Sequence, residues 1–307
     1  MKEQTGGESA DWSGPLHAPG RRSLQEAASP PPKLDSVTFD QLLAQQDSLG
    51  TGAFDLAGTS FISPSGLVSL AVGMQEASRT ANDVTLQVTD PALRTYLARA
   101  GLLTNLPRGC RVVPESSWLS HAYDHRQGRS PLLIELTQIN DVPTLERLLD
   151  RTITCVERVR GRRNDALDLA ALVSELGANL LEHGGGQGYL ALQVYGSGAH
   201  TFLELAIGDA GEGIRRSLHR NPELPRYADD LQAISDAVRP RISGSNEPAR
   251  GSGLYQLLRL VVLEHGGSVQ IRSGAGKARW RAGRSRGNGF SVTHMSGTQI
   301  TVSVPAP

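Results

Sequence analysis

The chain has 307 residues, of which 38% are hydrophobic and 20% charged, so it can bury the cores of about two domains. Its 31 basic and 31 acidic residues give a formal net charge of zero, which gives no electrostatic reason to expect nucleic acid or an anionic membrane as a partner. Two cysteines exclude a disulfide scaffold, and the sequence lacks the roughly 18 consecutive apolar residues of a membrane span, so we expect a soluble, cytoplasmic protein.

Residues 1–34 form a first region that is rich in Gly, Ser, Pro and Glu and includes the run Ser-Pro-Pro-Pro at 29–32. Such a composition cannot bury enough apolar surface to offset the entropy of ordering the chain. We therefore predict a disordered tail that ends at residue 34.

Residues 35–112 predict a small α/β domain. A turn at 63–66 is followed by apolar residues at helical spacing, and Val, Leu and Val alternate over 84–88 as they do in a strand. Pro91 is placed to occupy the first turn of a second helix, which Gly101 can end. The alternation of strands and helices is typical of an α/β unit.

Residues 113–130 are polar and mixed in composition, and we interpret them as a connector to a second domain that covers 131–307. The glycines at 283, 287 and 289 predict a loose loop before the last strand. From the hydrophobic pattern we expect the following elements in chain order: a strand at 132–136, helices at 142–160 and 165–183, strands near 189–195 and 201–208, an irregular stretch over 215–250, a helix at about 252–265, and strands at 268–272 and 298–304.

The second expected helix of this domain, with Asp165 as its N-cap, carries Glu175, Asn179 and His183 at positions i, i+4 and i+8. This spacing puts the three side chains on one face. An amide oxygen at Asn179 can ligate Mg²⁺, and a carboxylate at Glu175 can orient or deprotonate a nucleophile. Since exposed helices often contain Glu-x-x-x-Asn, the pattern alone is more typical of a solvated helix face than of a site.

An apolar strand then leads into Asp209, followed by Gly211, Gly213 and Ile214. Glycines at alternate positions let a backbone approach a planar ligand closely and adopt positive φ. An aspartate held beside them can accept a hydrogen bond from an exocyclic amine such as that of adenine. A plain glycine turn after a strand is the alternative interpretation.

A second glycine loop, Gly251-Ser252-Gly253-Leu254, opens directly into an apolar helix. Free N–H groups and the positive end of the helix dipole would point out of such a loop, which is the arrangement that binds phosphate. The loop is not a Walker A loop, because no Lys-Ser/Thr pair follows its glycines. It is not a dinucleotide fingerprint either, because it follows an irregular segment instead of a strand. Finally, Thr298 precedes the last strand.

Taken together, the order and spacing of these segments resemble the GHKL family, which includes the ATPase domains of gyrase, large heat-shock chaperones, histidine kinases and MutL repair proteins. The resemblance covers about residues 131–305 and is nearest to anti-sigma-factor serine kinases and free-standing HATPase regulators, which share Asn-Leu-Leu-Glu-His-Gly as found at 179–184. It implies an α/β sandwich with helices over one face of a mixed sheet.

The resemblance also implies roles for the residues. Glu175 would be a general base, Asn179 would ligate Mg²⁺, and Asp209 would bind the adenine amino group. Residues 215–250 would be the lid over the ATP. The other residues that we expect at the nucleotide are His183, Gly211, Gly213, Ile214, Gly251, Ser252, Gly253, Leu254 and Thr298.

Residues 50–112 resemble a STAS domain, the fold of anti-sigma-factor antagonists, in the stretches 55–67 and 90–102. STAS antagonists carry Asp-Ser-Ser/Thr-Gly at the start of a helix, with a phosphorylated Ser or Thr. This chain has Ser-Pro-Ser-Gly at 63–66, without the aspartate and with proline at one candidate position. The departure argues against phosphorylation of Ser63 or Ser65 and leaves Ser65 as the expected helix cap.

These observations lead to one expected function and two alternatives. We expect a signalling protein that binds Mg-ATP and controls a regulatory protein partner, acting as a serine/threonine kinase. The alternatives are an ATP-driven conformational switch with slow hydrolysis and an ATP-binding module without catalysis. The sequence leaves open whether the protein forms a homodimer.

Overall fold

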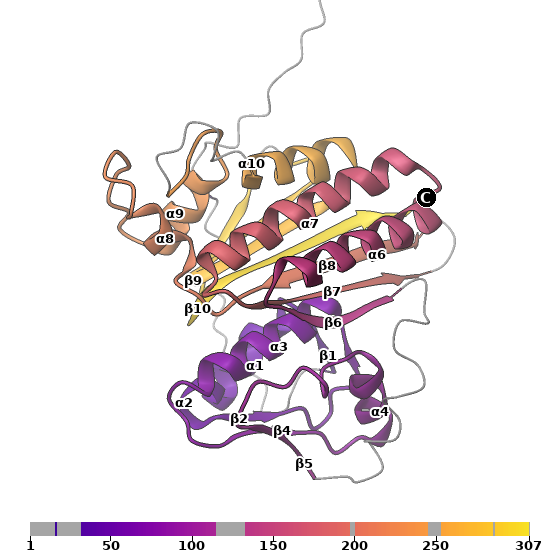
Figure 1. The fold of residues 1–307 in the computed structure, drawn as a ribbon. Helices are drawn as coiled ribbons and strands as arrows, with labels where there is room; N and C mark the ends of the chain where they lie inside the picture. The colour runs from indigo at the N-terminus through magenta and orange to yellow at the C-terminus, as the bar shows by residue number, and fades with distance from the viewer. Residues whose placement is uncertain are drawn as a thin grey trace, which may run out of the picture.

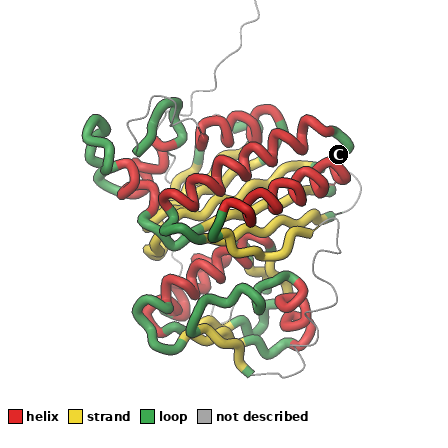
Figure 2. The backbone as a smooth tube through the Cα atoms, viewed as in Figure 1, coloured by secondary structure: helices red, strands yellow, loops and turns green. Residues whose placement is uncertain are grey.

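The computed structural model describes Leu16 and residues 32–114, 133–196, 200–244, 253–284 and 286–306. These residues form a mixed α/β structure with strands in three sheets (Figures 1 and 2). Within these ranges, none of the helices combines the length and the apolar character that crossing a membrane requires. Most of the predicted tail and of the predicted connector lies outside the described residues. The tail was predicted to end too late, because β1 (Lys33–Leu34) already pairs with another strand.

The largest sheet has five strands in the order β6-β7-β8-β10-β9, and all of its neighbouring pairs are antiparallel. The expected mixed sheet is therefore wrong for this part of the chain. Two helices join β6 to β7, as predicted, so the chain enters β7 at the end of the sheet where it left β6, and the two strands run antiparallel. The five strands are β6 (Leu133–Ile139), β7 (Gly188–Tyr195), β8 (Phe202–Gly208), β9 (Ser268–Arg281) and β10 (Asn288–Pro305).

Helices α6 (Val142–Arg160), α7 (Arg163–His183) and α10 (Gly253–Leu258) cover one face of this sheet (Figure 1). A π-helix, η2 (Arg259–Glu264), directly continues α10. The bounds of α6 match the prediction, whereas α7 begins two residues before the predicted cap. Asp165 caps nothing there, because it lies in the first turn and pairs with Arg160 of α6 at 2.7 Å instead.

The strands divide large and small side chains between the two faces of the sheet. Since neighbouring residues in a strand point to opposite faces, Leu190 and Leu192 pack under α6 and α7, while Tyr189 and Ala191 point to the other side. In β8, Leu205 and Ile207 likewise face the helices, and Ala206 faces away. The small alanines leave room for another layer to approach that second face closely.

The predicted irregular stretch between β8 and α10 contains two short helices, α8 (Gly213–Leu218) and α9 (Asp230–Ala237). Asp229 caps α9 by accepting a hydrogen bond from the backbone N–H of Gln232 at 2.8 Å. Ala233 and Ile234 anchor α9 in the same core as the large helices. We missed these helices because each is too short for a hydrophobic period to be read.

The last two strands are much longer than predicted and form one hairpin. Gly283 and Gly287 lie in the predicted loop, but pairing continues out to Asn288 with Arg279 in a hairpin that also takes in Gly289. Within it, Ala278 and Trp280 are buried in the core. The charged residues that alternate with them, Lys277, Arg279 and Arg281, hid this alternation in the sequence.

Residues 32–114 form the N-terminal unit, in which β2, β4 and β5 make a parallel three-stranded sheet and β1 pairs with β3 in parallel. The predicted strand at 84–88 and the helix starting at Pro91 are confirmed. Ser63, not Ser65, is the N-cap of α3, because its Oγ accepts the hydrogen bond from Gly66 N–H. The remaining elements are α1 (Thr38–Gln46), α2 (Ser48–Thr51), β2 (Ala53–Asp55), β3 (Phe61–Ile62), α3 (Pro64–Ala77), β4 (Val84–Gln87), α4 (Pro91–Arg99) and β5 (Cys110–Val113).

The N-terminal unit lies on the second face of the five-stranded sheet, with α3 against β7, β8 and β10 (Figure 1). One continuous hydrophobic cluster joins α3 to the sheet residues Tyr189, Ala191 and Ala206. Ser69 Oγ of α3 also donates to the side chain of Gln299 in β10 at 2.8 Å. The two predicted domains therefore share a core.

Two polar contacts fix the rest of this unit to the sheet. A buried ion cluster joins Asp40 of α1 to Arg272 of β9, at 3.0 Å, and to Lys277. At the opposite edge of the sheet, along β6, the side chain of Asn105 donates to the carbonyl of Leu136 at 2.8 Å and accepts from Gln138 N–H at 3.2 Å. Asn105 thus covers the outer edge of β6.

Candidate functional site

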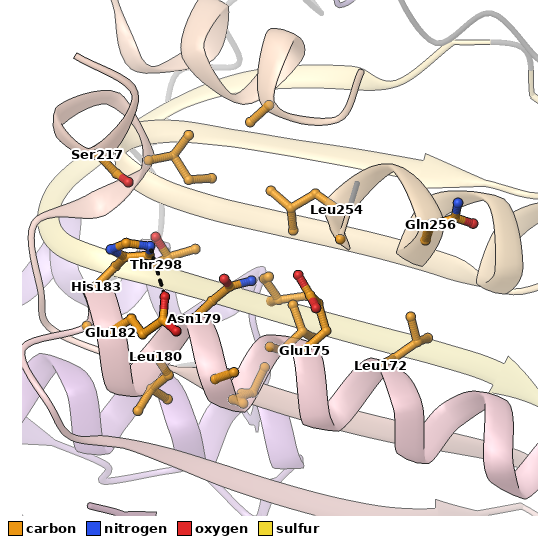
Figure 3. A pocket seen from close by; sticks show the side chains of 18 of the residues that line it. Leu172, Glu175, Asn179, Leu180, Glu182, His183, Ser217, Leu254, Gln256 and Thr298 are labelled. Atoms are coloured by element: carbon orange, nitrogen blue, oxygen red, sulfur yellow. Dashed lines mark ion pairs between the residues drawn. The ribbon is translucent and has the colours of Figure 1, made fainter. Parts of the chain in front are cut away.

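A cavity of about 750 Å³ opens between α7 and α10, above the five-stranded sheet. Its walls come from separate parts of the chain: one face of α7, the end of β8 with the start of α8, the start of α10, and β10 near Thr298. Figure 3 shows the side chains of α7 and α10 pointing toward each other across this space. The volume is typical of a site for a small organic ligand.

The α7 wall carries the three polar residues that the helical spacing placed on one face. Glu175, Asn179 and His183 all line the cavity (Figure 3). The start of α10 approaches this wall so closely that a Cβ atom on Gly253 would lie 2.5 Å from Oε1 of Glu175. The backbone at Gly253 therefore lies directly against the carboxylate of Glu175. A larger residue at position 253 would push this carboxylate away.

Asp209 lies at one end of the cavity and is buried, with 8% of the residue exposed. Oδ1 of Asp209 accepts a hydrogen bond from Gly211 N–H at 2.7 Å, and Asp209 N–H donates to the carbonyl of Thr298 at 2.9 Å. Burial raises the pKa of Asp209 to about 6, although hydrogen bonds from the backbone N–H groups of Gly211 and Thr298 oppose the rise. This carboxylate is a partly desolvated acceptor next to an open cavity.

The loop after Asp209 depends on glycine for two reasons. Gly213 has φ of 79°, which L side chains rarely adopt. A Cβ on Gly211 would lie 2.6 Å from the Cα of Gly184, at the end of α7. Close packing of this loop against α7 and β10 therefore sets the position of Asp209.

Nine of the twelve predicted site residues line this one cavity. Gly211 lies behind Asp209 and does not reach the cavity, while Gly251 and Ser252 lie outside the described residues. The nine residues are Glu175, Asn179, His183, Asp209, Gly213, Ile214, Gly253, Leu254 and Thr298.

His183 stands at the same end of the cavity as Thr298 (Figure 3). Its Nε2 lies 3.8 Å from a carboxylate oxygen of Glu182, and its Nδ1 is buried without a hydrogen-bond partner among the described residues. Because the side chain is about one-third exposed, it can turn to meet a ligand. The Nδ1 atom of His183 is therefore available for a hydrogen bond to a ligand in the cavity.

Acidic groups predominate in the part of the lining that the structure describes. Arg259 of η2 is paired with Glu264 at 3.0 Å. Sequence reasoning missed Asp168, although it lies seven residues before Glu175 and the helical period puts it on the same face. The acidic lining residues are Asp168, Glu175, Glu182, Asp209, Glu212 and Glu264.

The oxygen atoms at this site suit a hard divalent cation that is shared with a ligand. The described residues contain no group of three or more His, Cys, Asp and Glu side chains that could hold a metal ion alone. Mg²⁺ differs from such ions, because it takes one or two protein oxygens and fills its other positions with phosphate and water. The amide oxygen of Asn179, beside the carboxylate of Glu175, fits that requirement.

Comparison with protein-family models gives no match, and comparison with curated proteins gives none either. Any assignment of function must therefore start from the cavity and its side chains.

Proposed function

We propose that this protein binds Mg-ATP in the cavity between α7 and α10 and transfers the γ-phosphoryl group to a hydroxyl group of a regulatory protein. One observation carries the proposal: nine residues selected from the sequence, in four separate segments, line a single cavity. The GHKL-like arrangement of the chain and the STAS-like character of the N-terminal unit belong to the same proposal.

The Asp209 end of the cavity is suited to the adenine ring. Asp209 offers a carboxylate acceptor to the exocyclic amine, and the aliphatic side chains of Ile214 and Ile300 in the lining offer apolar surface to a planar base. Thr298 and His183 add polar atoms at the same end. A base with a carbonyl in place of the amine would set two acceptors against each other, so this end favours adenine.

The Glu175 end is suited to the phosphates. α10 begins at Gly253, beside Glu175, and the first N–H groups of a helix have no partner within that helix, so they suit a phosphate at this end. Phosphates entering a lining with so many carboxylates would be repelled unless a cation came with them. Bound Mg²⁺ would supply that charge, with Asn179 as its protein ligand.

Glu175 then acts on the acceptor. Its carboxylate takes the proton of a hydroxyl group whose oxygen attacks the γ-phosphorus, while the bond from that phosphorus to the β,γ-bridging oxygen breaks and ADP leaves. Hydrolysis would use the same residues with water as the nucleophile. In an ATP-driven switch, the N-terminal unit packed on the second face of the sheet would be the part that responds to the bound nucleotide. Transfer to protein and slow hydrolysis are therefore the two activities to distinguish.

Titration with ATP, with and without Mg²⁺, tests the binding part of the proposal on wild type and Asp209→Ala. We expect binding that needs Mg²⁺ and weakens at least tenfold in the variant, since a buried acceptor is lost. Equal binding by the two proteins would overturn the proposal. Incubation with γ-labelled ATP and candidate partner proteins then separates transfer, which labels a protein, from hydrolysis, which releases labelled phosphate.

A further inference from the structure

Asp209, in the loop after β8, and Thr298, in an irregular stretch of β10, meet at one end of the cavity, and both segments are also held from behind. The loop at 209–211 leaves the end of β8. Residues 296–298 lie within β10, where its register with β9 shifts and just before its pairing with β8 begins at Gln299. On the far side of the sheet, the carboxyl end of α3 in the N-terminal unit reaches both of them.

Two neighbouring side chains make these contacts. Arg79, two residues after the end of α3, donates from Nη2 to the carbonyl of Ala210, the residue between Asp209 and Gly211. Glu76 accepts a hydrogen bond from Ser296 Oγ at 2.6 Å. Arg79 Nη1 and Glu76 Oε2 are 2.6 Å apart, so the pair joins the 209–211 loop to the 296–298 segment of β10.

We propose that Arg79 is a positioning residue of the nucleotide site, contributed by the N-terminal unit: it holds Ala210, and through it the carboxylate of Asp209, in the orientation that accepts the adenine amine. The inference rests on the proposed function. It makes the N-terminal unit a structural part of the site, although this unit lines none of the cavity.

Loss of Arg79 should therefore weaken recognition of the adenine base without weakening the contacts to the phosphates. Without Arg79, the 209–211 loop loses a charge-assisted hydrogen bond to its carbonyl, while the hydrogen bond between Gly211 and Asp209 within the loop remains. The carboxylate would then be free to move as a unit with its loop. Contacts to the phosphates at the Glu175 end would not change, because they come from α7 and α10.

The test compares the affinities of Mg-ATP and Mg-GTP for wild type, Arg79→Ala and Arg79→Lys by calorimetry. We expect Arg79→Ala to weaken ATP binding roughly fivefold to tenfold, as one charged hydrogen bond predicts, and to leave GTP binding unchanged. Lysine can still donate to the carbonyl of Ala210, so Arg79→Lys should recover ATP affinity to within about threefold of wild type.

Arg111→Ala is the matched control. Arg111 lies in the same unit, its side chain is 49% exposed like that of Arg79, and it also pairs with one carboxylate, that of Asp83. This variant should bind ATP and GTP as wild type does.

Two outcomes would overturn the inference and leave the proposed function intact. One is wild-type ATP affinity in Arg79→Ala together with weak binding in Asp209→Ala. The other is an equal loss of ATP and GTP affinity in Arg79→Ala, which would indicate general damage. If both variants bind ATP like wild type, the proposed function itself fails.

Glu76→Gln keeps the inference testable if Arg79→Ala does not fold. Glutamine can still accept from Ser296, but it loses the ion pair that orients Arg79. We expect a smaller loss of the ATP preference in this variant. Undiminished preference for ATP over GTP in a folded Glu76→Gln protein would contradict the positioning role.

Discussion

The two faces of the five-stranded sheet are both covered by helices, but the two layers differ in what they leave between them and the strands. On the α6, α7 and α10 side, large aliphatic side chains build a core that stops short of a cavity of about 750 Å³ with polar walls. On the α1 and α3 side, alanines in β7 and β8 let α3 pack directly on the strands, and the charged side chains there are paired with one another. One sheet thus supports a layer that leaves room for a ligand and a layer that fixes the position of the loops around it.

The largest expected effect is a loss of catalytic rate from a substitution on the cavity side of the sheet. Glu175→Gln is expected to lower phosphoryl transfer or hydrolysis by about 10²- to 10⁴-fold, because the general base is lost while the shape of the side chain is kept. ATP affinity and the thermal unfolding midpoint should stay near wild type. Labelled-phosphate assays measure the rate, with Glu157→Gln, on the exposed surface of α6, as the control. An active Glu175→Gln protein would remove Glu175 from the chemistry.

On the opposite side the expected effect is on stability. Asp40→Ala leaves Arg272 and Lys277 buried without their carboxylate, and breaking a buried ion cluster in this way costs about 3–5 kcal/mol of unfolding free energy. Urea unfolding measures the loss. Asp83→Ala, which breaks only the exposed pair with Arg111, should give no comparable change. Equal stability of these two variants would contradict the distinction between the layers.

Asp209 lies where the two layers meet, and its substitution should affect stability and binding in opposite directions. The pKa of Asp209, about 6, lies above its ordinary value of 3.8 because burial outweighs the nearby Arg79 and Glu212 also disfavours the charged form. As the pH rises, the carboxyl group therefore loses its proton at a lower pH in the unfolded chain than in the folded one. Burying the charged carboxylate lowers the free energy of unfolding by an amount that is absent below pH 4, grows up to about pH 6 and is complete at pH 8.

Asp209→Asn removes that penalty and should stabilise the protein by on the order of 3 kcal/mol at pH 8, but not at pH 4. ATP binding should weaken in the same variant, and in wild type it should weaken as the pH falls below about 6. Unfolding curves and ATP titrations across this pH range measure both effects. A variant that is less stable than wild type at pH 8 would show that the charge of Asp209 is stabilised in the fold.

The smallest expected effect tests the contact between the layers themselves. Ser69→Ala leaves the buried side-chain oxygen of Gln299 without its hydrogen bond, which should cost about 1 kcal/mol. Chemical denaturation measures the difference. Thr95→Ala, which removes an exposed hydroxyl bonded to its own helix, is the control and should change stability less.

The sequence predicted the helical layer better than the layer beneath the sheet. The spacing of Glu175, Asn179 and His183 is a property of one helix, and it could be read without knowing the fold. The ion pair between Asp40 and Arg272 joins residues that are 232 positions apart in the sequence, and no local sequence pattern predicts it. The same is true of Arg79 and Ala210.

Two errors had local causes. Ser65 was taken as the cap of α3 because both serines before the helix are suitable, and only the extended backbone of Ser63 decides between them. The β9–β10 hairpin was cut short because arginine and glycine are poor strand formers, although Trp280 and Ala278 bury one of its faces.

The hydrogen bonds of Asn105 to β6 bear on how copies of this protein could assemble. An edge strand with free N–H and C=O groups can be extended by a strand from another molecule. Along β6, however, Asn105 bonds the carbonyl of Leu136 and the N–H of Gln138, and Leu136 N–H donates to Ala100. A homodimer would therefore not form by continuing the sheet across β6, and since α3 occupies the second face, it would not form by stacking two sheets on that face either.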